Sequence, residues 1–249
     1  MLSTRARQEI LDRIGEALSH RAAGEPSSPD NHSTLANDDR YDASDAHSNR
    51  VQQRDALILQ FEEELAAVGG LFHRAPNAAA ACDCVVRIAS VHKARKAIAW
   101  DLALIGDIGL ATSLGEAGIE FTPGSAGVPP AIIDAASADI GVTAVDYALA
   151  DTGTLVLRSG PGRARSVSLL PPVHIALLRP DQIIPGLDDL FPLLARDNES
   201  EARPDSALTF ITGPSRTADI ELTLVVGVHG PQELHVILLD EDNRAKEGD

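Results

Sequence analysis

Three arginines and two glycines fall within residues 158–165 (RSGPGRAR), directly after an apolar run typical of a buried strand. Glycines let backbone N–H groups approach a ligand, and guanidinium groups bind carboxylate or phosphate in a bidentate manner. Open α/β sheets place their ligand sites at strand ends. The alternative interpretation, with equal weight, is an exposed arginine loop paired with surface acids. The residues predicted to bind a small anion are Gly160, Gly162, Arg163, Arg165 and Ser166.

Asp151 lies just before the same strand, in the sequence Asp-Thr-Gly. A carboxylate at a strand end could act as a base or a nucleophile, and our central hypothesis places the arginine loop opposite this acid. Asp-x-Gly also caps backbone N–H groups in ordinary turns, and the three residues by themselves favour that role.

A second polar segment, residues 212–221 (TGPSRTADIE), follows another apolar run. It combines hydroxyl groups, an arginine and acids, so we predict that it binds polar groups of a ligand. The competing interpretation is a strand-to-helix connection in which Ser215 caps a helical turn. The candidate ligand-binding residues are Thr212, Ser215, Arg216 and Asp219.

Three histidines, His174, His229 and His235, stand near strand ends. We favour His229 as a general base because an imidazole titrates near neutral pH and the following Gly-Pro makes a fixed turn. Strand-end hydrogen bonding is the alternative for all three. Their spacing does not specify a metal site, and we predict none.

Composition limits the function classes. The 249 residues carry 37 acids against 21 bases, a formal charge of -16, which disfavours nucleic acids and anionic membranes as partners. The two cysteines, Cys82 and Cys84, cannot supply four cluster ligands and are expected to be buried on a helix. No apolar run is long enough for a membrane span, so we expect a cytoplasmic protein.

Composition also divides the chain. Residues 1–20 are predicted to contain an amphipathic helix. Its apolar face packs on its own domain or on a second copy of the chain, as in a homodimer. The alternative is that it docks a partner protein. Residues 21–50 are too polar to offset their ordering entropy and are predicted to be a flexible linker. Residues 51–240 form the main domain, and residues 241–249 an acidic tail.

The main domain alternates strands with helical segments, which predicts an α/β fold with a mostly parallel sheet. The predicted helices cover residues 57–68, 77–91, 107–117, 129–136 and 187–195. The predicted strands outside the opening loop cover residues 96–100, 119–122, 208–212, 222–228 and 234–239. A short turn before the last strand indicates a less regular, antiparallel second half. Fingerprints of dinucleotide enzymes, P-loop NTPases, α/β-hydrolases and zincins are absent.

Several segments resemble the lactate-utilization (LUD) domain family: residues 148–157, 162–171, 211–221 and 227–231, with the 10–14 helix similar to that family's leader. The resemblance implies a Rossmann-like fold similar to the NagB/RpiA/CoA-transferase superfamily. It also implies a part in oxidising L-lactate to pyruvate beside partner subunits that carry iron–sulfur clusters, with no cofactor in this chain. Relatives carry Glu where this sequence has Asp151, so a covalent acyl-CoA role for this residue is not expected.

Three function hypotheses follow. In the leading one the chain is a subunit of an L-lactate-oxidising complex, in which the arginines bind an anionic ligand while Asp151 and His229 transfer protons. In the second it is a non-catalytic assembly subunit for iron–sulfur partners. In the third it is a CoA-ester or sugar-phosphate enzyme that acts without partners.

Overall fold

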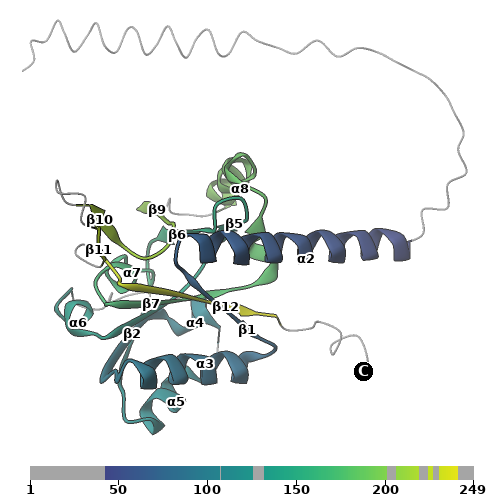
Figure 1. Cartoon of the computed structure of the whole chain (residues 1–249). Coiled ribbons are helices and arrows are strands. Elements are labelled where there is room, and N and C mark those ends of the chain that lie inside the picture. Colours follow the sequence, from purple (N-terminus) through teal and green to yellow (C-terminus); the bar gives the residue numbers. More distant parts are fainter. Residues whose placement is uncertain are drawn as a thin grey trace, which may run out of the picture. The chain divides into compact units, whose positions relative to one another are not determined.

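A computed structural model describes residues 43–106, 108–125, 132–200, 206–218, 224–226 and 230–240 (Figure 1). Predictions for the 1–20 helix, linker residues 21–42, the 241–249 tail, Asp219 and His229 concern positions outside these ranges. Within the described part, no helix combines the length and apolarity that crossing a bilayer requires.

Six parallel strands form the main sheet, in the order β1-β12-β7-β4-β2-β3. The α/β class and the mostly parallel sheet are confirmed. The prediction that the last strand belongs to an antiparallel half is wrong, because β12 lies between β1 and β7 and runs parallel to both. The strands are β1 (Leu71–Ala75), β2 (Lys96–Asp101), β3 (Glu120–Gly124), β4 (Ile140–Ala144), β7 (Val173–Leu178) and β12 (Glu233–Leu239).

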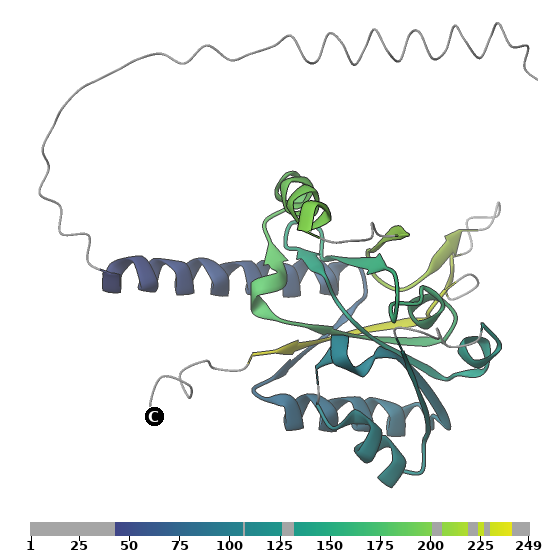
Figure 2. The ribbon, with the colours of Figure 1, turned by 180° about the vertical axis from the view of Figure 1, so that it is seen from behind.

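Helices cover both faces of this sheet (Figures 1 and 2). Helices α3 and α5 lie on one face, and α2 and α7 on the other. The Asn77 side chain caps α3 by accepting from the Ala80 N–H, as predicted. Cys82 and Cys84 are buried on α3, also as predicted. The helices are α2 (Ala43–Ala67), α3 (Ala78–Val91), α4 (Leu102–Ile105), α5 (Leu110–Glu116), α6 (Ile132–Ser137), α7 (Ser166–Leu169), α8 (Leu187–Ser200) and the 3-10 turn η1 (Pro180–Gln182).

Helix α2 begins at Ala43, so residues 43–50 belong to a helix and not to the predicted linker. The polarity of these residues suggested a linker, yet polar residues continue a helix readily once its later turns are anchored by packing. Ile58, Phe61 and Leu65 supply that anchor in the core. The predicted end of this helix near residue 68 is confirmed: α2 ends at Ala67, and the Gly70 N–H donates to the Leu65 carbonyl.

A second sheet has the order β8-β5-β6-β9, with β6 antiparallel to both of its neighbours. Successive residues of β6 point to opposite faces. Leu155 and Leu157 therefore enter the main core, whereas Val156 packs with Leu190 and Leu194 of α8. The strands are β5 (Tyr147–Leu149), β6 (Thr154–Ser159), β8 (Ile183–Ile184) and β9 (Ala207–Ile211); a separate ribbon pairs β10 (Arg216–Ala218) with β11 (Leu224–Val226).

Strands β2 and β4 are neighbours, but the connections that follow them lead to opposite sides of the sheet. After β2 the chain next enters the sheet on one side, as β3; after β4 it enters on the other side, as β7. Loops diverge at such a point and leave a crevice at the carboxyl ends of the two strands. The fold therefore predicts where a ligand site should lie, before any side chain is considered.

Close packing between β4 and α7 gives a test of the fold. A Cβ atom at Gly141 would lie 1.9 Å from the carbonyl oxygen of Val167, which is backbone that cannot rotate away. We expect Gly141→Ala to lower the free energy of unfolding by about 3 kcal/mol, at the upper end for overpacking. The control is Gly115→Ala within α5, where a Cβ meets nothing within 4 Å. It should raise stability by up to about 1 kcal/mol, because alanine favours helix. Urea unfolding of both variants measures this, and equal midpoints would contradict the packing.

Candidate functional site

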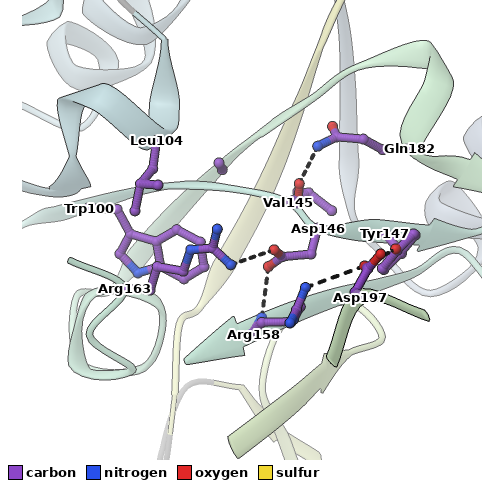
Figure 3. A pocket seen from close by; sticks show the side chains of 10 residues that line it. Trp100, Leu104, Val145, Asp146, Tyr147, Arg158, Arg163, Gln182 and Asp197 are labelled. Atoms are coloured by element: carbon purple, nitrogen blue, oxygen red, sulfur yellow. Dashed lines mark hydrogen bonds and ion pairs between the residues drawn. The ribbon is translucent and has the colours of Figure 1, made fainter. Parts of the chain in front are cut away.

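A cavity of about 160 Å³ lies at the carboxyl ends of β2 and β4, at the crevice that the topology predicts (Figure 3). Its size suits a small molecule, since sites for drug-sized ligands start near about 300 Å³. Most lining groups are polar. The lining residues are Trp100, Leu104, Ala144, Val145, Asp146, Tyr147, Arg158, Arg163, Gln182 and Asp197.

Strand alternation places two of the polar groups, Tyr147 and Arg158. Arg158 follows Val156 by two residues, and Tyr147 pairs directly with Val156, so all three side chains share the face covered by α8. Asp197, in the same helix, meets both polar side chains. It accepts from the Tyr147 hydroxyl at 2.5 Å and from Arg158 Nη1 at 3.3 Å.

A tight turn positions Arg163. Gly160 and Arg163 exchange backbone hydrogen bonds around Pro161-Gly162, and Gly162 has φ +73°, the pattern of a type II turn. A Cβ at Gly162 would lie 2.9 Å from that of Asp101, so the turn packs closely on the end of β2. Trp100 Nε1 donates to the Ala164 carbonyl at 3.1 Å and so fixes the loop to the end of β2.

Asp146 joins the two arginines. Its Oδ1 accepts from Arg163 Nη1 at 2.8 Å, and its Oδ2 accepts from the Arg158 backbone N–H at 2.8 Å. Figure 3 shows the Arg163 guanidinium pointing at the Asp146 carboxylate, to which it is hydrogen-bonded. Arg163 keeps 25% of its side chain exposed, whereas Arg158 keeps 4%. Arg163 is thus the more solvent-accessible of these two cationic groups.

Tyr147 remains protonated across the physiological range. Burial, together with the hydrogen bond to Asp197 and the charge of that carboxylate, raises the pKa of Tyr147 from 10.0 to about 12. The cavity therefore combines two guanidinium groups, two carboxylates and a neutral phenol. Such a set can hold a small carboxylate on the cationic side while polar groups orient the rest of the molecule.

The predicted arginine loop only partly reaches the cavity. Arg163 lines it, and Gly160 and Gly162 shape the turn that carries Arg163. Arg165 is exposed and precedes α7, and Ser166 is the first residue of that short helix. Neither residue is among those that line the cavity.

The predicted pairing of this loop with Asp151 is wrong. Asp151 precedes β6 and the loop follows it, so six strand residues, about 20 Å, separate them. Asp151 is exposed in the turn from β5 to β6. There a Cβ at Gly153 (φ +61°) would lie 2.4 Å from the backbone nitrogen of Leu65 in α2. The Asp-Thr-Gly sequence forms this close turn. This is the turn role that the three residues by themselves favoured.

Most of the 212–221 segment is also distant from the cavity. The Thr212 hydroxyl bonds that of Thr154 at the amino end of β6, 2.8 Å away. Arg216 Nη2 donates to the Val68 carbonyl at the end of α2, at 2.6 Å. The Ser215 N–H donates to the Pro231 carbonyl, and β10 follows this residue, so the predicted helical turn is absent here. These described residues tie β9 and β10 to α2.

Two of the three highlighted histidines fall in the described part, and both are buried strand residues. His174 Nε2 bonds the Thr143 hydroxyl at 2.9 Å, and burial lowers the pKa of His174 to about 3. His235 lies at the amino end of β12, away from the cavity. Neither histidine is placed to transfer a proton in the cavity.

Sequence reasoning missed Asp146, Tyr147 and Asp197. A signal did exist for Arg158, an arginine that directly extends the apolar run of β6, since a buried charge needs a partner. Asp146 likewise follows the buried strand β4. For Asp197 there was no signal, because it is one of several acids in a polar stretch of α8.

A crevice at a topological switch point, lined by paired charges, defines an α/β protein with a candidate site for a small polar ligand. Residues 58–239 match the LUD domain, and the chain belongs to the LUD domain family.

The chain is similar to proteins named lactate utilization protein C. The relative from Halalkalibacterium halodurans is 39% identical over 150 residues, 60% of this chain and 65% of that protein. The relative from Shouchella clausii is 32% identical over 190 residues, 76% and 81% of the two chains. A crystal structure of a DUF162 family protein from Deinococcus radiodurans has a TM-score of 0.55 and 24% identity. It covers 75% of this chain and 98% of its own, and it shows the same fold.

The raised pKa of Tyr147 gives a test of the site. In a Tyr41→Phe background the remaining tyrosine should titrate near pH 12, followed by tyrosinate absorbance. Asp197→Asn should lower this pKa toward 10, because it replaces the carboxylate with a neutral amide and removes the negative charge. The control is Asp188→Asn, in the first turn of the same helix.

The same shift predicts the pH dependence of stability. The folded state has the higher pKa, so the contribution of Tyr147 is complete below pH 10 and is lost as the pH rises from 10 toward 12. A phenol that titrates at pH 10 in the folded Tyr41→Phe protein would contradict the described contact.

Proposed function

We propose that this protein serves in lactate utilization and that its carboxyl-edge cavity binds a small 2-hydroxy or 2-oxo acid such as L-lactate or pyruvate. Membership of the LUD domain family and the names of the relatives support the process. The observation that carries the ligand class is the partly exposed Arg163 guanidinium in the wall of a small polar cavity.

In this proposal Arg163 binds the ligand carboxylate. The guanidinium already holds one carboxylate, Asp146, through Nη1 at 2.8 Å. A guanidinium has five N–H donors, so its remaining donors can bind a second carboxylate. Tyr147 and Gln182 lie on the opposite wall and would orient the hydroxyl or keto oxygen (Figure 3).

The proposed role of the chain is to bind the acid within a larger complex. Oxidising L-lactate to pyruvate removes two electrons and two protons, so the reaction needs an electron acceptor. The proposal assigns that task to iron–sulfur clusters on partner subunits, because this chain has only two cysteines and both are buried on α3. Asp151 has no part in this proposal, since it lies at the other end of β6.

Arg163 and Arg165 form a matched pair for testing the ligand site. Arg163→Gln should weaken L-lactate and pyruvate binding by about 10-fold or more, the cost of a lost charge-assisted hydrogen bond. Arg165→Gln, two residues away and exposed, should change affinity by less than about 2-fold. Isothermal titration of the full chain measures both, and equal effects of the two substitutions would defeat the assignment.

Asp146 offers a test with the opposite sign. Asp146→Asn removes the negative charge that competes for Arg163, so it should tighten binding of a small carboxylate by several fold. A variant that merely misfolds would lose binding, so a gain cannot arise from damage. If Asp146→Asn weakens binding as Arg163→Gln does, Asp146 does not compete with the ligand for Arg163.

A further inference from the structure

A cluster of histidines with one glutamate lies at the amino end of β12, at the opposite edge of the sheet from the cavity. Glu233 and His235 are two residues apart on β12, so their side chains share a face. His92 caps the end of α3, which covers this face, and His73 comes from the neighbouring strand β1. Four side chains from three elements, distant in sequence, therefore meet at one place.

The distances match those of a metal centre. Glu233 Oε2 lies 3.3 Å from His92 Nε2 and 3.3 Å from His235 Nε2. Ligand atoms bound to Zn²⁺ at about 2.0–2.2 Å in a tetrahedron are separated by about 3.4 Å. All three atoms lie within 4.8 Å of one another, so the two imidazoles need only a small approach to complete a triangular face.

His73 contacts the His235 ring through the nitrogen that does not face Glu233. His73 Nε2 lies 3.0 Å from His235 Nδ1, and the two rings stack with an interplanar angle of 16°. Histidines that bind a metal regularly use their other ring nitrogen for a hydrogen bond of this kind, which sets the tautomer. If His235 Nδ1–H donates to His73, the Nε2 lone pair points at the site shared with His92 and Glu233.

Charge and exposure suit a metal ion at this place. Two imidazole nitrogens and one carboxylate oxygen face one another. Glu233 supplies the negative charge, and its side chain is 44% exposed, so an ion can reach the site and keep a water ligand.

We propose that His92, Glu233 and His235 bind a divalent transition-metal ion, best fitted by Zn²⁺, with water in the fourth position and His73 as the positioning residue. Two imidazoles and one carboxylate are ligands that Zn²⁺ accepts in three-ligand sites. The ion would join the end of α3 to β12. No residue of this cluster lines the cavity, so this inference is independent of the proposed ligand there.

The test is Zn²⁺ binding by the full chain after treatment with a chelator. The chain has eight histidines, so only differences between variants identify the site. Glu233→Gln and His92→Gln should each weaken Zn²⁺ binding by more than about 100-fold, beyond the 10–100-fold expected for a supporting residue. His73→Phe keeps the stacking but loses the nitrogen, and should weaken binding by about 10–100-fold. The control Glu62→Gln removes an exposed carboxylate paired with Arg74, and should leave binding unchanged.

A spectroscopic probe and a thermal measurement complete the experiment. Co²⁺ in place of Zn²⁺ should give the visible absorption of tetrahedral cobalt in the wild type and lose it in Glu233→Gln. Zn²⁺ should raise the melting temperature of the wild type and not that of the variant, since an ion that binds only the folded state stabilises it. Wild-type affinity no tighter than that of Glu233→Gln, with both proteins folded, would overturn the proposal.

Discussion

The Asp146 carboxylate holds the candidate site together. One oxygen accepts from the backbone of β6 and the other from the guanidinium of Arg163, so a single side chain joins the end of β4, the end of β6 and the turn that follows β6. The carboxylate is 14% exposed, and a charge this sheltered is stable only with partners of the kind it has. Because these groups come from separate connections, the cavity exists only when both sheets are docked.

The second sheet acts as a support between two apolar layers. Its inner residues join the main core, and its outer residues pack on α8, so β6 is buried along its whole length. A strand with no solvent-facing side has little freedom to shift register. Arg158, close to the end of this strand, is therefore held rigidly, and a buried cation beside the more exposed Arg163 suits the recognition of a small acid.

The two edges of the main sheet carry different chemistry. The carboxyl edge has diverging loops, arginines and acids around an open cavity. The amino edge has a compact set of histidines and one glutamate between α3, β1 and β12. Strand direction accounts for the difference, because parallel strands bring all their following loops to one edge and all their preceding residues to the other.

Much of the fold could be read from local patterns. Asn77, the Gly69-Gly70 pair and the apolar runs of β6 and β7 each act through backbone rules that hold in any protein. The start of α2 and the direction of β12 could not be read in this way. Both depend on packing partners far away along the chain, such as Gly153 against Leu65 and β12 against β1.

The sequence by itself determined the α/β class, the buried strands and the glycine turn that presents Arg163, because periodicity and turn chemistry are local. Tertiary structure alone decided which acid faces that arginine. Residue spacing suggested Asp151, but β6 is extended and separates them by its full length, whereas chain reversal at β5 brings Asp146 to the same end. Charge pairing acts through space over a few ångströms, so only the folded chain can select the partners.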